Sequence, residues 1–269
     1  MPFHESLFYE ESPAGGGKPL LLLHGLGAHS YTWRHLRPVI PGSYKPYFVD
    51  LKGFGRAKKP ADERYSPQDQ AALVCGLIDT LGPAPVTIVG HSMGGAVALI
   101  TALRLLDAGV PPSRLVLIGA VSYPVPAFSL VSNPVVKLLL RAVACLPPKL
   151  LIRAGLKKAF FDDAKITPDM IEAYAAPLAA PGGMAALRKA GTMLFPPNLA
   201  ALRTRYPEIA APTLLLWGRQ DELIGLGDGQ KLEAALPNAA LEIVESCGHI
   251  PHEERPAEAV PKIAAFLAA

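Results

Sequence analysis

The stretch Val89-Gly90-His91-Ser92-Met93-Gly94-Gly95 decides the fold of the chain. An apolar run at 86–89 leads into it and predicts a strand, and the small-residue pattern at 96–106 predicts a helix. The serine is flanked by glycines in a G-x-S-x-G pattern, which is typical of a strained corner that lifts the serine hydroxyl above the edge of a sheet. We therefore predict that Ser92 is a nucleophile able to attack a bound carbonyl.

Strand and helix patterns alternate along the rest of the chain. Short apolar runs predict strands, and longer segments between them have helical patterns. The expected strands cover 6–10, 20–23, 46–51, 86–89, 114–119, 213–218 and 241–244, and the expected helices include 33–40 and 67–81. Such alternation predicts an α/β fold with a mostly parallel sheet covered on both faces, whose active residues gather at the carboxyl ends of the strands.

Length and composition favour a single α/β domain with an insertion. The chain has 269 residues, of which 50% are hydrophobic, so it has ample apolar surface to bury. A formal net charge of +3 and an isoelectric point near 8.7 are too mild to indicate nucleic-acid binding. Three scattered cysteines, Cys75, Cys145 and Cys247, predict neither a disulfide framework nor a metal site.

The sequence contains no targeting or membrane-spanning pattern. Residues 1–11 have no basic region followed by an apolar core, and no apolar run approaches the roughly 20 residues that cross a bilayer. We expect a cytoplasmic protein without stable membrane insertion, either a monomer or a homodimer.

Five motifs in order resemble those of the α/β-hydrolase superfamily, in its serine esterase-like branch with a helical cap. They are His24-Gly25-Leu26-Gly27, Asp50-Leu51-Lys52-Gly53-Phe54-Gly55, Gly90-His91-Ser92-Met93-Gly94-Gly95, Gly218-Arg219-Gln220-Asp221 and Gly248-His249-Ile250-Pro251. The resemblance covers the chain from about residue 20 to the end. It implies an α/β-hydrolase fold and a Ser-His-acid triad, and it leaves the substrate open because the superfamily supports many reactions.

The family's order of serine, acid and histidine assigns the base to His249, in the loop after the last strand. His249 would take the proton of Ser92 as the serine attacks. His252 remains a second candidate, although it starts the acidic run that heads the last helix.

The acid is assigned to Asp221. The family allows a carboxylate after either of two strands, and after the strand at 114–119 no Asp or Glu occurs before Asp162. Asp221 follows the strand at 213–218 and would accept the Nδ1–H of His249. Its neighbour Glu222 remains an alternative.

Two backbone N–H groups, those of Leu26 and Met93, are expected to form an oxyanion hole. Leu26 lies in the small-residue loop after the strand at 20–23, and Met93 follows the serine. Such groups can hold the negative oxygen that forms when a carbonyl is attacked. The alternative is that the loop at Leu26 is only a tight turn. The mechanism requires no metal and no organic cofactor.

We expect residues 121–198 to form a helical cap on a core made of 1–120 and 199–269. Prolines divide this insertion into short helical pieces, and a cap of this kind excludes water and shapes the pocket. The apolar residues that are candidates for the pocket are Phe128, Leu139, Met193, Leu194 and Phe195. Each could instead belong to the packed interior of the cap.

The cap sequence is basic. No acidic residue occurs between Asp107 and Asp162. The basic residues of the same stretch are Arg114, Lys137, Arg141, Lys149, Arg153, Lys157 and Lys158. A solvated outer face explains this pattern. The other explanation is a surface for an anionic lipid or for an acidic partner such as an acyl carrier.

Hydrolysis of a carboxylic ester with an apolar acyl group is the reaction we expect, through an acyl-enzyme. The stretch 185–191 with Arg188 is similar to the cap of carbon–carbon hydrolases of ring-cleavage pathways. Those enzymes typically carry Asn before the nucleophile and Trp after the histidine, where this chain has His91 and Ile250. Carbon–carbon hydrolysis and hydrolysis of a thioester or carrier-bound ester remain alternatives, as does a non-catalytic small-molecule receptor.

Overall fold

The computed structural model describes residues 3–11, 17–82, 84–123, 147–195 and 199–269. In this part of the chain eight strands form one sheet in the order β1-β2-β4-β3-β5-β6-β7-β8. The strands span Phe3–His4 (β1), Leu7–Glu11 (β2), Lys18–Leu23 (β3), Tyr44–Asp50 (β4), Thr87–His91 (β5), Arg114–Ile118 (β6), Thr213–Gly218 (β7) and Ala239–Val244 (β8). Only the pairs β1–β2 and β2–β4 are antiparallel, so the predicted mostly parallel sheet is confirmed.

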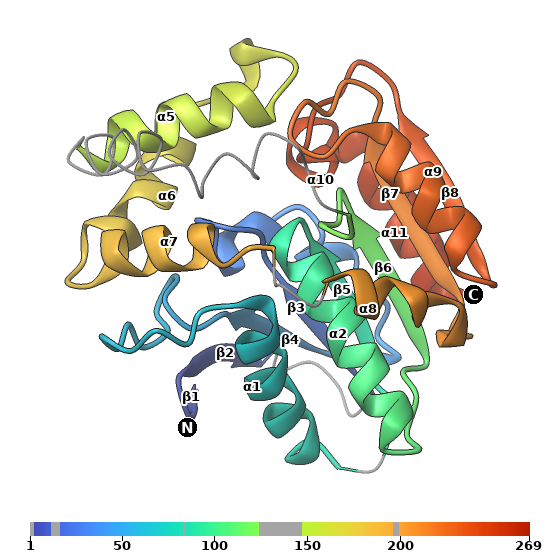
Figure 1. The fold of residues 1–269 in the computed structure, drawn as a ribbon. Helices are drawn as coiled ribbons and strands as arrows, with labels where there is room; N and C mark the ends of the chain where they lie inside the picture. Colours follow the sequence, from blue (N-terminus) through green and yellow to red (C-terminus); the bar gives the residue numbers. More distant parts are fainter. Residues whose placement is uncertain (1–2, 12–16, 83, 124–146, 196–198) are drawn as a thin grey trace.

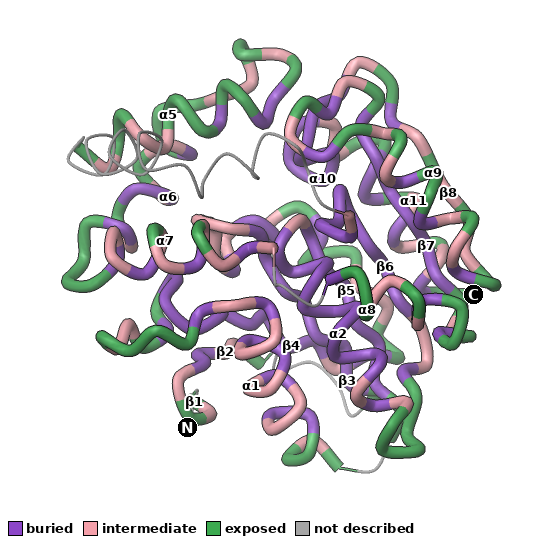
Figure 2. Tube along the Cα trace, viewed as in Figure 1, coloured by how far each residue is buried: buried purple, intermediate pink, exposed green. Residues whose placement is uncertain are grey.

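Both faces of the sheet are buried, as β3 shows most clearly. Its four leucines alternate between two hydrophobic layers: Leu21 and Leu23 belong to one, and Leu20 and Leu22 to the other. All four have 0% exposure, because a strand in the middle of a parallel sheet has helices on both sides. Figure 2 shows this interior as buried strands beneath partly exposed helices.

Helices and short 3-10 turns supply the two covering layers of the core (Figure 1). Those outside the predicted cap are η1 (Ser30–Trp33), η2 (Arg37–Val39), α1 (Pro67–Asp79), α2 (Met93–Asp107), α8 (Leu199–Thr204), η5 (Tyr206–Glu208), α9 (Leu226–Ala235), α10 (Pro251–Glu254) and α11 (Pro256–Ala268). The helix predicted at 33–40 was wrong, because this region forms the separate turns η1 and η2. Pro38 lies inside η2 and has no N–H to donate, which prevents a continuous helical ladder.

Three helices of the predicted cap lie together beyond the carboxyl ends of the strands (Figure 1). They are α5 (Pro148–Ala159), α6 (Pro168–Ala179) and α7 (Gly183–Thr192), with the turn η4 (Asp163–Lys165) between the first two. Apolar side chains of α5 and α6 pack on Ile250, next to the predicted base. The predicted boundaries of the cap stay a prediction, because 124–146 and 196–198 lie outside the described residues. No helix of the described ranges is long and apolar enough to cross a membrane.

Candidate active site

Ser92 lies at a strained corner between β5 and α2. Its φ and ψ are 53° and −117°, a combination that L side chains rarely adopt and that costs about 1–3 kcal/mol. Hydrogen bonds hold the corner in place: the N–H of Ser92 donates to the carbonyl of Ile118 at 2.9 Å, and its carbonyl accepts from Val121 at 3.0 Å. The corner is therefore anchored to β6 as well as to its own strand and helix.

The two glycines of the corner are required by close backbone approach. A Cβ on Gly90 would lie 2.8 Å from the carbonyl carbon of Gly94, and a Cβ on Gly94 would lie 2.6 Å from the carbonyl oxygen of His24. Real Cβ atoms do not approach other atoms this closely. The G-x-S-x-G pattern thus has a packing cause in this fold: the helix starts directly against the end of β3.

His249 and Asp221 form a buried hydrogen-bonded pair. Nδ1 of His249 donates to Oδ2 of Asp221 at 2.7 Å. The other carboxylate oxygen, Oδ1, accepts from the backbone N–H groups of Leu223 and Ile224, each at 2.9 Å. With its oxygens fixed by these three donors, Asp221 sets the orientation of the imidazole and leaves Nε2 without the proton.

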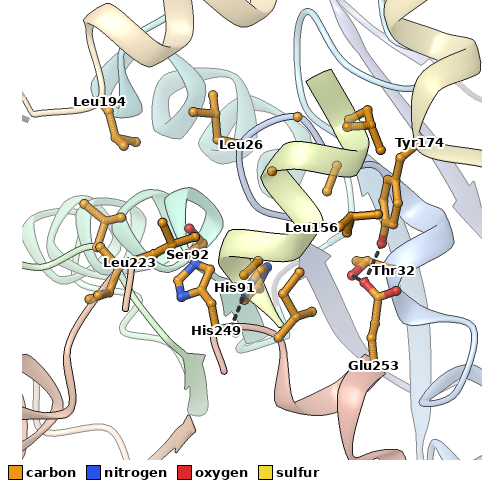
Figure 3. Close-up of a pocket in the computed structure, with 18 residues that line it drawn as sticks. Leu26, Thr32, His91, Ser92, Leu156, Tyr174, Leu194, Leu223, His249 and Glu253 are labelled. Carbon is orange, nitrogen blue, oxygen red and sulfur yellow. Dashed lines mark hydrogen bonds between the residues drawn. The ribbon is translucent and has the colours of Figure 1, made fainter. Parts of the chain in front are cut away.

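Ser92 and His249 line the same cavity, and Figure 3 shows their side chains next to each other. The structure therefore brings together the three residues predicted to form the triad. They come from different strand ends: Ser92 follows β5, Asp221 follows β7 and His249 follows β8.

The loop that carries His249 is fastened on several sides. The N–H of His249 donates to the carbonyl of Ala159, the last residue of α5, at 2.6 Å. Its own carbonyl accepts from Nε2 of His91 at 3.1 Å. The neighbouring N–H of Gly248 donates to Oε2 of Glu254 at 2.7 Å.

Glu254 connects this loop to the segment that follows α5. Its other oxygen, Oε1, accepts from the N–H groups of Phe161 and Asp162 at 2.9 and 2.8 Å. The glutamate is 1% exposed, and backbone donors from two segments satisfy its carboxylate. No sequence pattern predicted this role of Glu254, because the acidic run at 253–254 indicated only the start of a helix.

The two residues left as alternatives for the triad have other partners. Nε2 of His252 donates to Oγ1 of Thr32 at 2.9 Å, and the ring stacks on Trp33 with centroids 4.9 Å apart. Glu222 is exposed and pairs with Lys158. Neither residue lines the cavity that contains Ser92.

Three buried histidines remain neutral at ordinary pH. Desolvation lowers the pKa of His252 to about 3 and that of His24 to about 4. Burial, together with the neighbouring His249 and His252, holds the pKa of His91 well below its usual value. The centroid of the His91 ring lies 4.9 Å from those of His249 and His252, so the neutral His91 packs directly against the candidate base.

The N–H groups of Leu26 and Met93 both lie at the candidate site. Met93 is the first residue of α2, where N–H groups have no acceptor within the helix, and Leu26 lies in the loop after β3 and lines the cavity. Within the described ranges, no hydrogen bond uses either N–H. Both N–H groups are therefore without a partner in this part of the chain, and their role as an oxyanion hole stays a prediction.

The cavity is mostly apolar and has a volume of about 280 Å³. Its apolar lining comes from core loops and cap helices. These side chains include Leu26, Val121, Ile152, Leu156, Leu194, Leu223, Ile224 and Ile250. Leu194 was predicted to line it, whereas Met193 and Phe195 pack against the hydrophobic core instead. Phe128 and Leu139 lie outside the described residues.

The basic helix α5 is largely neutralised by carboxylates from elsewhere in the chain. Lys149 pairs with Glu172 at 2.5 Å, Lys157 pairs with Asp163 at 2.7 Å and Lys158 pairs with Glu222. A sequence that is locally free of acidic residues is therefore not a free cationic surface along this helix. Lys137 and Arg141 lie outside the described residues, so a lipid or acidic carrier at the cap stays a prediction.

In the described part of the chain, no three His, Cys, Asp or Glu side chains gather in a group that could hold a metal ion. Cys75 and Cys247 are free thiols. Burial and the nearby Glu254 raise the pKa of the Cys247 thiol far above its usual value, so this cysteine is not an activated nucleophile.

Residues 20–262 match the alpha/beta hydrolase family. The chain belongs to this family. As a member of it, the protein is a hydrolase, and the match includes all five motifs that the sequence analysis singled out.

The similar proteins include hydrolases that are named for the compounds on which they act. The 2-hydroxymuconate semialdehyde hydrolase of Pseudomonas putida is 30% identical over 90% of this chain and 85% of its own length. The 2-hydroxy-6-oxononadienedioate/2-hydroxy-6-oxononatrienedioate hydrolase of Comamonas testosteroni is 29% identical over 88% of this chain and 82% of its own length. The solved structure of an esterase from Exiguobacterium antarcticum superimposes with a TM-score of 0.80 and is 20% identical. The superposition covers 98% of this chain and 96% of the esterase. That likeness is one of fold.

Proposed function

We propose that this alpha/beta hydrolase cleaves small, uncharged carboxylic esters through an acyl-enzyme on Ser92. The observation that carries the proposal is that Ser92 and the hydrogen-bonded pair of His249 and Asp221 meet at one apolar cavity. An apolar wall favours a substrate without charge, because a charged group would lose its hydration there without a partner.

In the proposed reaction, Nε2 of His249 takes the hydroxyl proton of Ser92 as Oγ attacks the ester carbonyl carbon. The N–H groups of Leu26 and Met93 stabilise the oxyanion. The bond to the alkoxy oxygen breaks, and that oxygen leaves as the alcohol with the proton from His249. Water, deprotonated by the same histidine, then attacks the acyl-enzyme and releases the acid and free Ser92.

Carbon–carbon bond hydrolysis is the second candidate, and the two named relatives favour it. The nonadienedioate named for one of them carries carboxylates. Among the described residues that line the cavity there is no Lys or Arg, and Glu253 contributes a further carboxylate. This lining favours an uncharged ester over an anionic dienoate.

The experiment compares initial rates on p-nitrophenyl acetate, butyrate and octanoate with rates on a 2-hydroxy-6-oxo-dienoate. Ser92→Ala is the control for background hydrolysis. We expect turnover of the short esters at least 100-fold above the dienoate in kcat/KM. The reverse order would assign the protein to carbon–carbon hydrolysis, and ligand binding without turnover of any substrate would indicate a receptor.

A further inference from the structure

Apart from Ser92 and the histidines His91 and His249, the polar side chains among the described residues that line the cavity are Thr32, Tyr174 and Glu253, which we call the polar corner. All three residues line the cavity together with Ser92. Figure 3 shows them on the side of the cavity opposite Leu194 and Leu223. None of the three takes part in the mechanism described above.

Three segments that are distant in sequence build this corner. Thr32 belongs to η1, Tyr174 to the cap helix α6, and Glu253 to α10. Oγ1 of Thr32 donates to Oε1 of Glu253 at 2.5 Å, and the Tyr174 hydroxyl donates to the same oxygen. Oε2 of Glu253 accepts from Nη1 of Arg34, whose side chain does not line the cavity.

In the polar corner every hydroxyl proton is used in a hydrogen bond, whereas the hydroxyl oxygens of Thr32 and Tyr174 can each accept a further one. Thr32 uses its one proton toward Glu253 and accepts the Nε2–H of His252. Tyr174 also uses its one proton toward Glu253, so its oxygen retains only acceptor capacity. Burial and the adjacent Glu253 raise the pKa of Tyr174 well above its usual value, which keeps this proton in place.

We propose that the polar corner selects substrates by accepting a hydrogen bond from an uncharged donor, such as a hydroxyl group, in a part of the ester remote from its carbonyl. This inference rests on the proposed ester hydrolysis and names the substrate class more closely. A ketone or a carboxylate is disfavoured, because it brings only acceptors to a corner that has no donor to spare. An ammonium group is disfavoured as well, since Arg34 already neutralises Glu253 and the cation would lose its hydration.

The test uses matched p-nitrophenyl esters with acyl chains of four to eight carbons. At each length the acid is prepared plain, with a hydroxyl on the penultimate carbon, and with a ketone on the same carbon. A second series places the same hydroxyl or ketone in the alcohol of an acetate ester, and acid release is followed. At the length that reaches the corner, we expect the hydroxyl ester to exceed the ketone about tenfold in kcat/KM, mainly through KM.

Two variants separate recognition from packing. Tyr174→Phe removes the accepting oxygen, and we expect the hydroxyl-to-ketone ratio to fall by about fivefold or more. Tyr31→Phe is the matched control, because the Tyr31 ring packs against Tyr174 at 5.5 Å but does not line the cavity. We expect the ratio to be unchanged in Tyr31→Phe.

Glu253→Gln should reverse the preference. Its amide oxygen would face Arg34, and its NH2 would donate to Thr32 and Tyr174, whose own protons are then free to donate into the cavity. We expect the kcat/KM of the ketone ester to rise relative to that of the hydroxyl ester in this variant. Thermal unfolding checks that the variant is folded.

Equal rates for hydroxyl and ketone esters at every length in both series would overturn the inference while plain esters still turn over. An unchanged ratio in Tyr174→Phe would overturn it too. A failure to hydrolyse any ester would instead contradict the proposed function and remove the inference with it.

Discussion

A Cβ atom on Gly119 would lie 3.0 Å from Nδ1 of His249, although the two residues follow different strands of the sheet. Gly119 comes directly after β6 and has a φ of +48°. The imidazole of the candidate base therefore packs against a backbone position that only glycine leaves open. The end of β6 is also the position at which the family allows the catalytic acid and at which this sequence has no Asp or Glu.

Gly119→Ala should consequently lower esterase activity beyond the loss that its reduced folding stability would cause. The added methyl group would displace the His249 ring, and we expect kcat to fall at least tenfold. Gly109→Ala is the matched control, because Gly109 has a φ of +76° and nothing within 4 Å of its would-be Cβ. Gly109→Ala should lose about 1 kcal/mol in the free energy of unfolding because of its positive φ, and Gly119→Ala should lose at least as much. Equal esterase activity in the two variants would contradict this packing argument.

Asp221→Asn should leave the fold intact and lower kcat by about 10³–10⁴-fold. The Asn oxygen would keep accepting from Leu223 and Ile224, so its NH2 would face His249 and impose the wrong tautomer. Glu222→Gln, at the exposed neighbour that pairs with Lys158, should retain full activity. Steady-state rates on a short p-nitrophenyl ester measure both. A loss in Glu222→Gln comparable to that in Asp221→Asn would move the acid to Glu222.

The variants of His249, in the loop after β8, and of His252, in α10, should differ in activity in the same assay. His249→Gln removes the base beside Ser92, and we expect its kcat to fall by at least 10³-fold. His252→Gln removes a ring that hydrogen-bonds to Thr32 and stacks on Trp33, so we expect kcat to change less than fivefold. If His252→Gln were the inactive variant, the assignment of the base would be wrong.

The stability of the protein should fall as the pH decreases below about 6.5. The pKa of His252 is lowered to about 3 in the folded state, so between pH 6.5 and pH 3 the unfolded chain binds a proton that the folded chain does not. The contribution of His252 to the free energy of unfolding is therefore fully present above pH 6.5 and is lost progressively below it. At pH 5 the loss is up to about 2 kcal/mol for this imidazole.

Urea unfolding at pH 7.5 and pH 5 measures this effect. His252→Gln should reduce the difference in unfolding free energy between the two pH values, whereas His4→Gln, at a partly exposed edge-strand residue, serves as the control. The explanation fails if the pH dependence of His252→Gln equals that of the unmodified protein.

The sequence was most informative where local pattern and packing agree. The run of leucines at 20–23 has no polar member, which favours burial on both faces, and the glycines around Ser92 favour a tight corner. The proposed triad residues could be named because their motifs resemble those of the α/β-hydrolase superfamily, whose order of serine, acid and histidine fits residues that follow three strands of this sheet.

The remaining features depend on contacts between segments that no local pattern encodes. Tyr174 and Glu253 are 79 residues apart and meet only because α6 and α10 both contribute a side chain to the same cavity. The charge of α5 likewise looked unpaired in sequence, since its carboxylate partners, such as Glu172 and Glu222, come from later segments. The short helix predicted at 33–40 was wrong, because Pro38 cannot donate to a continuous helical ladder and the region forms separate turns.

The most direct test of the proposed chemistry is the covalent state of Ser92 during turnover. The protein is mixed with excess p-nitrophenyl butyrate, quenched in acid within the first turnover, and analysed by peptide mass spectrometry alongside Ser92→Ala. We predict a burst of about one equivalent of p-nitrophenol and a butyryl group on the peptide that contains Ser92, both absent from the variant. Ester turnover that persists in Ser92→Ala, or that proceeds without any acylated Ser92, would contradict the account.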